Sequence, residues 1–192
     1  MPAQYKTPRL KYAAWLVMAL PAVWIIGRFA ADIITYGGAV HETGLWSAGF
    51  LVAALAVTPL RRAIAKSGLA KFAAYHRRAL GVASFGYAAL HTGIYLWRKI
   101  PLGRVISEGQ RPDLLLGWLA LAIFIPLAVT SHNRAVKAMG ARWSALHRSV
   151  YIAAALTFAH AILSSGRPAL SYSLLAVWLA AIAARMLFKK RG

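Results

Sequence analysis

The sequence contains no cysteine, and only four of its 192 residues are acidic. Without cysteine the chain can form no disulfide bond, ligate no iron–sulfur cluster through thiolates and attach no c-type haem through a C-x-x-C-H motif. It also lacks a P-loop and a G-x-G-x-x-G motif for nucleotide binding. Any haem or metal must therefore be held non-covalently, by side chains such as histidine or methionine.

Basic residues dominate the charge of the chain. Lys and Arg number 23, which gives a net charge of +19. Such a charge can indicate nucleic-acid binding. Here, however, 60% of the residues are hydrophobic, only 14% are charged, and the basic residues form short clusters between apolar runs. This distribution favours a polytopic membrane protein over a nucleic-acid-binding protein.

Six apolar segments predict an all-α fold, a bundle of six transmembrane helices that forms a single domain over residues 1–192. The second segment is short for a membrane span, so tilt or added flanking residues are expected. No small-residue cleavage site follows the first apolar run, which indicates an uncleaved first span rather than a signal peptide. The predicted spans are residues 12–30, 44–60, 72–97, 113–130, 143–164 and 169–188.

The distribution of Lys and Arg predicts the orientation of the bundle. Successive spans place the basic clusters alternately on the two sides of the membrane. One side carries only six of the 23, and the other side carries the remaining 17 together with both termini. By the positive-inside rule, both termini are predicted to be cytoplasmic. The six residues on the outer side are Arg28, Arg98, Lys99, Arg104, Arg111 and Arg167.

Two of the predicted spans each carry a pair of histidines, His76 and His91 in the third, His147 and His160 in the fifth. A histidine inside a membrane span is energetically costly and marks a functional site by default. These two spans run in the same direction, so histidines at similar positions along them lie at similar depths in the membrane. His91 and His160 then lie at one depth on the outer side, and His76 and His147 at another near the cytoplasm. The two levels lie about 20 Å apart. This spacing suggests one or two haems held between the third and fifth helices, which would transfer electrons because two histidines fill both axial positions.

The two histidines of the third span lie closer together around the helix axis than the two histidines of the fifth span. On an ideal helix, His76 and His91 lie about 60° apart around the axis, but His147 and His160 lie about 140° apart. One face of the fifth helix therefore cannot serve both levels unless the helix bends. We predict His91 and His160 as the ligands of an outer haem. His147 is an alternative ligand or the partner of His76 on an inner haem.

Each histidine could instead serve only to form a hydrogen bond to a neighbouring helix. This alternative is strongest for His76, which lies beside Arg77 and Arg78 near the predicted interface. Together with Arg148, these arginines are candidates to pair with haem propionates, and they equally fit lipid headgroups. The remaining histidines, predicted to lie in solvent-exposed loops, are His41 and His132.

Short motifs along most of the chain, in order and at family-like spacing, resemble those of one family. They are His41-Glu42-Thr43-Gly44, Thr58-Pro59-Leu60, Arg77-Arg78-Ala79-Leu80-Gly81, Ala89-Leu90-His91, Arg111-Pro112, Leu127–Ser131 (LAVTS), Gly140–Trp143 (GARW), Leu146–Tyr151 (LHRSVY) and His160. On these motifs the chain resembles the MsrQ (YedZ) family. Its members are haem-binding membrane subunits of a bacterial periplasmic protein-methionine-sulfoxide reductase system, within the ferric-reductase-like transmembrane group.

The resemblance implies a b-type cytochrome of the bacterial inner membrane, with His91, His147 and His160 as candidate ligands of one or two haems b. It implies an electron-transfer subunit rather than a catalytic one. The donor would be quinol or a cytosolic flavin reductase, and the acceptor a periplasmic molybdopterin-containing reductase. FMN is also associated with the family, but no residue of this chain is assigned to it. His76 departs from the family pattern, which leaves the number of haems open.

Two other functions remain open from the sequence. The first is a ferric-chelate reductase of the same architecture, which would pass electrons to metal without a reductase partner. The second is a haem-free transporter or assembly factor, whose histidines only pack or bind a substrate. The purified protein would then show no Soret band.

Overall fold

The computed structural model describes residues 8–99, 108, 110–164 and 168–189. Within these ranges the chain is helical apart from short turns, and no strand is present. The predicted all-α fold is therefore confirmed for the described residues. The helices are α1 (Pro8–Ala30), α2 (Tyr36–Ala63), α3 (Gly68–Lys99), α5 (Pro112–Val129), α6 (Asn133–Met139), α7 (Ala141–Arg148), α8 (Val150–Ser164) and α9 (Pro168–Lys189).

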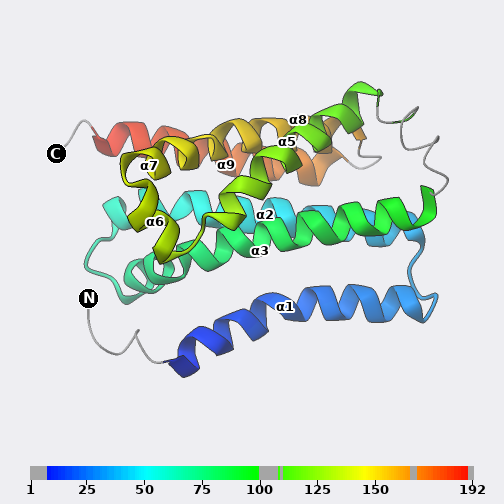
Figure 1. The fold of residues 1–192 in the computed structure, drawn as a ribbon, viewed down its shortest axis with the longest axis horizontal. Helices are drawn as coiled ribbons and strands as arrows, with labels where there is room; N and C mark the ends of the chain where they lie inside the picture. Colours follow the sequence, from blue (N-terminus) through cyan, green and yellow to red (C-terminus); the bar gives the residue numbers. More distant parts are fainter. Residues whose placement is uncertain (1–7, 100–107, 109, 165–167, 190–192) are drawn as a thin grey trace.

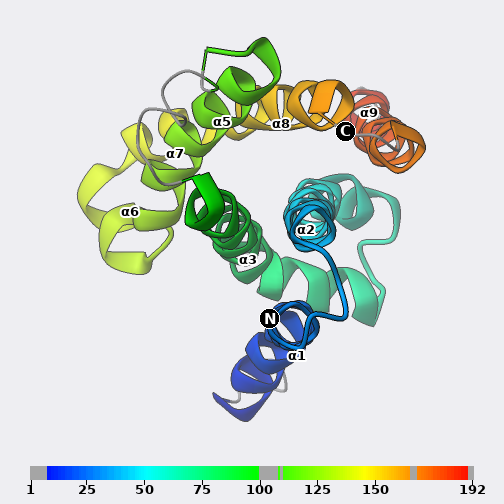
Figure 2. The same ribbon diagram turned by 90° about the vertical axis from the view of Figure 1, so that its right-hand side faces the viewer.

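The long helices run back and forth along one axis of the molecule (Figure 1). Seen along that axis, α2 and α3 lie in the middle, α1 flanks them on one side, and α5, α8 and α9 form an arc on the other (Figure 2). The first turn of α1 and the last turn of α9 lie at the same end of the bundle. Some of the basic residues used to predict the orientation, Lys6, Arg104, Arg167, Lys190 and Arg191, lie outside the described residues.

Among the residues that the structure describes, five helical segments are long and apolar enough to cross a membrane, so the chain has the character of a multi-pass membrane protein. In α9 the apolar stretch, Ala169–Ala184, is shorter than a full span. The sixth span therefore stays a prediction. The five segments are Tyr12–Ala30, Tyr36–Ala63, Gly68–Trp97, Pro112–Val129 and Ala141–Ser164.

The second span is longer than the sequence predicts. It was expected at residues 44–60, but α2 already begins at Tyr36, so His41 lies in a helix and not in a loop. Thr35 caps the helix, because its Oγ1 accepts a hydrogen bond of 3.1 Å from the backbone N–H of Gly38. The first turns of α2 also pack against α1 and α3. These contacts outweigh the low helix propensity of the glycines there.

The fifth span is interrupted. The segment expected as one helix over 143–164 consists of α7 and α8, which meet at Ser149. His147 and His160 therefore lie in different helical segments, on either side of Ser149, whose backbone keeps α-helical angles. The loop expected at 132–142 also contains a helix, α6. His132 is exposed at its N-terminus, where Nδ1 accepts a hydrogen bond from the N–H of Ala135.

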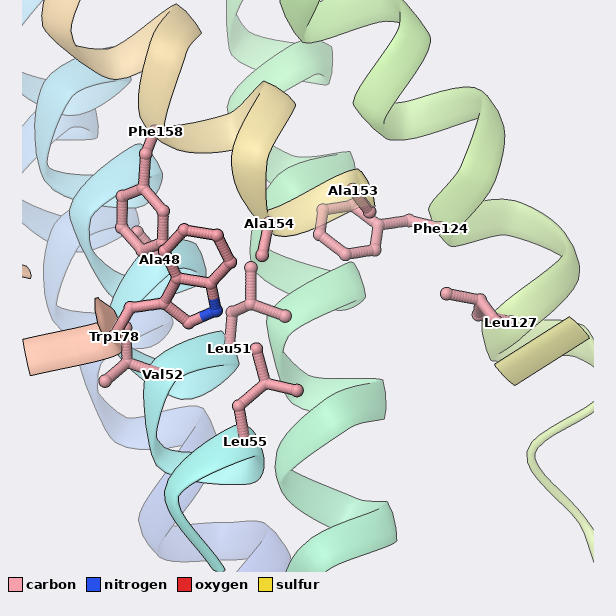
Figure 3. Packing of buried hydrophobic residues seen from close by; sticks show 10 residues of the cluster. All are labelled: Ala48, Leu51, Val52, Leu55, Phe124, Leu127, Ala153, Ala154, Phe158 and Trp178. Atoms are coloured by element: carbon pink, nitrogen blue, oxygen red, sulfur yellow. The ribbon is translucent and has the colours of Figure 1, made fainter. Parts of the chain in front are cut away.

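Apolar side chains from α2, α5, α8 and α9 meet in the core of the bundle (Figure 3). The rings of Phe158 and Trp178 lie 5.4 Å apart at its centre. Lipid is as apolar as this core, so in a bilayer the hydrophobic effect does not drive the helices together. Close packing of such side chains holds them instead, together with interhelical hydrogen bonds. The cluster consists of Ala48, Leu51, Val52, Leu55, Phe124, Leu127, Ala153, Ala154, Phe158 and Trp178.

Candidate functional site

A cavity of about 750 Å³ lies among α2, α3, α5, α8 and α9. Cofactor sites usually measure about 300–1,000 Å³. The core residues Ala48, Phe124 and Phe158 form part of its lining, and its other walls carry His91 from α3 and His160 from α8. The cavity is thus a mostly apolar chamber into which two imidazoles are directed from different helices.

His91 and His160 are paired across this cavity. Their ring centres are 6.1 Å apart and their planes are inclined at 82°. A metal–imidazole bond is about 2.0 Å long, and the ligating nitrogen lies about 1.1 Å from the ring centre, so two imidazoles on opposite sides of one metal have centres about 6.2 Å apart. The observed separation fits one iron between the rings. The structure therefore brings together the two histidines that the sequence pairs by depth.

Both histidines are oriented by a backbone carbonyl. Nδ1 of His91 lies 2.8 Å from the carbonyl oxygen of Val40, and Nδ1 of His160 lies 2.7 Å from that of Asp113. A carbonyl oxygen can only accept, so each Nδ1 carries the proton and donates it. Each Nε2 is therefore unprotonated, with a lone pair suited to a metal. Metal-ligating histidines usually have this arrangement.

The donor set fits haem better than a bare metal ion. Among the residues that the structure describes, no group of three or more His, Asp or Glu side chains could hold a metal ion. Two imidazoles on opposite sides of an iron leave four positions in one plane, which the nitrogens of a porphyrin fill. The cavity between the rings has a volume suited to such a group.

Two glycines that the sequence did not single out as site residues lie directly against these imidazoles. A Cβ on Gly44 of α2 would lie 3.2 Å from Nδ1 of His91, and one on Gly117 of α5 would lie 3.1 Å from Nδ1 of His160. Gly44 ends one of the family-like motifs, but Gly117 lies in an unremarkable apolar run. The sequence offers one signal, which is that each glycine lies in a predicted span next along the chain to a histidine-bearing span.

Ion pairs stabilise the ends of the helices that supply the two carbonyls. One guanidinium nitrogen of Arg28 in α1 donates to both carboxylate oxygens of Glu42 in α2, at 3.1 Å each. Arg111 forms a bidentate pair with Asp113 in the first turn of α5, with N···O distances of 3.2 and 3.1 Å. The first pair ties α1 to α2 close to Val40, and the second fixes the start of α5.

His147 does not line the cavity. Its Nε2 lies 2.9 Å from Oγ1 of Thr130, and its ring stacks on Trp143 with 3.9 Å between the centres. The structure thus places this predicted ligand in a separate contact between α7 and the end of α5.

His76 also lies away from the cavity. Its ring is buried between Phe72 and Tyr75, with centre distances of 4.5 and 4.9 Å. Its Nε2 has no hydrogen-bond partner among the described residues. No ring contact between His76 and His147 is found in the described part of the chain, so an inner haem between them stays a prediction.

The three arginines suggested as propionate partners are likewise outside the cavity lining. Nε of Arg77 donates to the carbonyl of Ala54 at 3.2 Å, and a guanidinium nitrogen of Arg78 donates to Oδ1 of Asn133 at 2.7 Å. Arg148 is exposed at the end of α7. A role in binding propionates therefore remains a prediction that concerns the inner level only.

Comparisons with known proteins agree on one family. The family model described as "Ferric reductase like transmembrane component" matches residues 43–158, a range that includes His91 and ends two residues before His160. Proteins of Brucella ovis, Brucella canis and Brucella suis named "Protein-methionine-sulfoxide reductase heme-binding subunit MsrQ" are each 37% identical over 172 residues. These alignments cover 83% of this chain and 74% of each relative. No solved structure matches the chain.

Proposed function

The chain belongs to the MsrQ family within the ferric-reductase-like transmembrane proteins, and on this premise we propose that it is a membrane electron-transfer subunit that binds haem b. The observation that carries the proposal is the His91–His160 pair, with ring centres 6.1 Å apart across a cavity of about 750 Å³. Both rings also carry their protons on Nδ1, so each Nε2 is suited to bind iron.

His91 and His160 would be the two axial ligands, each through Nε2. Haem supplies a one-electron redox centre when it is bound. If both histidines held the iron, no ligand position would remain for oxygen or a substrate, and this favours electron transfer over catalysis. The chain is accordingly proposed as an electron-transfer subunit rather than a catalytic one.

The surrounding residues prepare the site in two ways. Phe124 and Phe158 are buried and line the cavity with apolar surface, which would favour the apolar face of a haem. The carbonyls of Val40 and Asp113 fix the tautomer of each histidine and increase its basicity as a ligand. A more basic ligand favours the oxidised state of the iron.

We place the protein in the bacterial inner membrane with both termini cytoplasmic. The His91–His160 cavity lies toward the end of the bundle where α2 and α5 begin, opposite the end where α1 begins and α9 ends. In this orientation the site is near the periplasm. Electrons would come from quinol or a cytosolic flavin reductase and pass to a periplasmic molybdopterin-containing reductase that repairs methionine sulfoxide. The relatives' names as heme-binding subunits of a protein-methionine-sulfoxide reductase support a methionine-sulfoxide reductase as the partner. Its molybdopterin and its periplasmic location are proposed from the family resemblance only. FMN is proposed from the family resemblance only.

The proposal is tested by a reduced-minus-oxidised spectrum and by the amount of haem per chain in the detergent-purified protein. His91→Ala and His160→Ala are each expected to abolish most haem binding. His132→Ala is the matched control, because His132 is exposed and lies outside the cavity lining. Full haem content in both ligand variants would contradict the assignment.

A ferric-chelate reductase is the second candidate, because the matching family model is described by that activity. It would reduce ferric chelates without any protein acceptor, whereas the subunit proposed above would need its reductase partner for rapid turnover. A protein purified without a Soret band would instead indicate the haem-free transporter or assembly factor.

A further inference from the structure

We propose that Gly44 and Gly117 are positioning residues for the two haem-ligating imidazoles. Each glycine lies four residues after the carbonyl that orients its histidine, Val40 before Gly44 and Asp113 before Gly117. We call each carbonyl–glycine pair a clasp. The two clasps hold the rings of His91 and His160 nearly perpendicular, and this inference rests on the function proposed above.

The spacing of four residues has a geometric cause. In an α-helix the carbonyl of residue i accepts the N–H of residue i+4, so a second donor that reaches the same oxygen passes beside residue i+4. The Nδ1–H of His91 reaches the carbonyl of Val40 in this way, and that of His160 reaches the carbonyl of Asp113. Only glycine leaves this approach free of side-chain atoms.

The space at both positions is tight. A Cβ on Gly44 would lie 3.2 and 3.3 Å from Nδ1 and Cε1 of His91. A Cβ on Gly117 would lie 3.1 Å from both Nδ1 and Cε1 of His160 and 3.3 Å from its Cγ. At these distances the imidazole must give by a few tenths of an ångström when a methyl group is added. By contrast, a Cβ on Gly49 or Gly86 would have no other atom within 4 Å.

The clasps come from two separate helix pairs. The α2 clasp holds a ring of α3, and the α5 clasp holds a ring of α8. Each ring is thus held by its own backbone carbonyl, and the two rings so held are inclined at 82°. Each clasp thus controls one ligand plane and the strength of one Nδ1–H···O hydrogen bond.

The orientation of each ligand plane and the strength of each Nδ1–H···O hydrogen bond both have measurable consequences. Perpendicular axial imidazoles leave two iron d orbitals nearly equal in energy, which produces a highly anisotropic low-spin ferric EPR signal with a large maximum g value. Parallel imidazoles separate these orbitals and produce a rhombic signal. A strong Nδ1–H···O bond makes the imidazole a better electron donor and lowers the midpoint potential.

The test uses the full-length, haem-loaded protein and the variants Gly44→Ala and Gly117→Ala. Gly49→Ala in α2 and Gly86→Ala in α3 are the matched controls. We expect the wild type and both controls to show the highly anisotropic signal. Gly44→Ala and Gly117→Ala are expected to show a smaller maximum g value and a higher midpoint potential, because the displaced ring leaves the perpendicular arrangement and its hydrogen bond weakens.

Unchanged EPR spectra and potentials in Gly44→Ala and Gly117→Ala, relative to the controls, would overturn the inference while leaving the haem ligands in place. A rhombic signal of the wild type would also overturn it, and that result does not depend on whether any variant folds. A wild type that takes up no haem would overturn the proposed function together with this inference. Loss of haem in His91→Ala and His160→Ala separates the two cases.

Discussion

The side chain of His147 is held by Thr130, with 2.9 Å between Nε2 and Oγ1. The hydroxyl proton of Thr130 is directed to the carbonyl of Pro126 at 2.7 Å, so Oγ1 accepts and His147 Nε2 donates. The indole N–H of Trp143 donates to the carbonyl of Thr130 and completes the contact. His147 therefore carries its proton on the nitrogen that the two cavity histidines leave free for iron.

From this relationship we expect His147→Ala to retain the haem content of the wild type. The substitution removes a contact between α7 and α5 but no group that lines the cavity. Its cost should be close to that of one interhelical hydrogen bond in a membrane protein, about 0.6 kcal/mol. Haem per chain and the melting temperature in detergent check both statements. A loss of haem like that in His160→Ala would instead identify His147 as a ligand.

We expect His76→Leu to keep its haem and to unfold at an equal or higher temperature than the wild type. His76 is 5% exposed, and its Nε2 has no partner among the described residues. Replacing a buried polar group that lacks a partner with an apolar side chain of similar size removes a desolvation cost. Haem quantification and thermal unfolding are the measurements. A ratio of two haems per chain that falls to one in this variant would establish the inner site.

Ser47 and Ser84 exchange hydrogen bonds between α2 and α3. Each hydroxyl donates to the backbone carbonyl of the other residue at 2.9 Å, and both side chains are buried. We expect Ser47→Ala and Ser84→Ala each to lower the free energy of unfolding by about 0.6 kcal/mol, and the double variant by about 1.2 kcal/mol. Ser173→Ala is the control, because its exposed hydroxyl donates within α9. If all variants and the control had the same free energy of unfolding, the exchanged hydrogen bonds would contribute no stability.

The Arg111–Asp113 pair is expected to contribute modestly, and in a salt-dependent way, to stability. The side chain of Arg111 is 63% exposed and that of Asp113 is 12% exposed. Solvent screening therefore limits the effect of Arg111→Gln to about 0.5–1 kcal/mol at low ionic strength, and salt should reduce it further. Unfolding at two salt concentrations measures this dependence. An effect that does not change with salt would mean that the pair acts through packing.

Sequence reasoning failed where local signals were overridden by contacts. The sequence predicted a loop at His41, but the cap by Thr35 and the packing of α2 against α1 and α3 extend the helix to Tyr36. The break at Ser149 had no proline or glycine to mark it. It nevertheless separates α7 from α8, although the backbone of Ser149 keeps α-helical angles.

The sequence by itself determined the all-helical membrane class and the pairing of His91 with His160. Apolar runs separated by basic clusters locate the predicted spans, and the alternation of passes makes the third and fifth parallel, so counting residues yields matching depths. Only the tertiary structure decided how these rings are held. Every residue has a backbone carbonyl, so no side-chain pattern marks Val40 or Asp113 as acceptors. Their oxygens contact Nδ1 beside Gly44 and Gly117, where the absence of a Cβ leaves room for each ring.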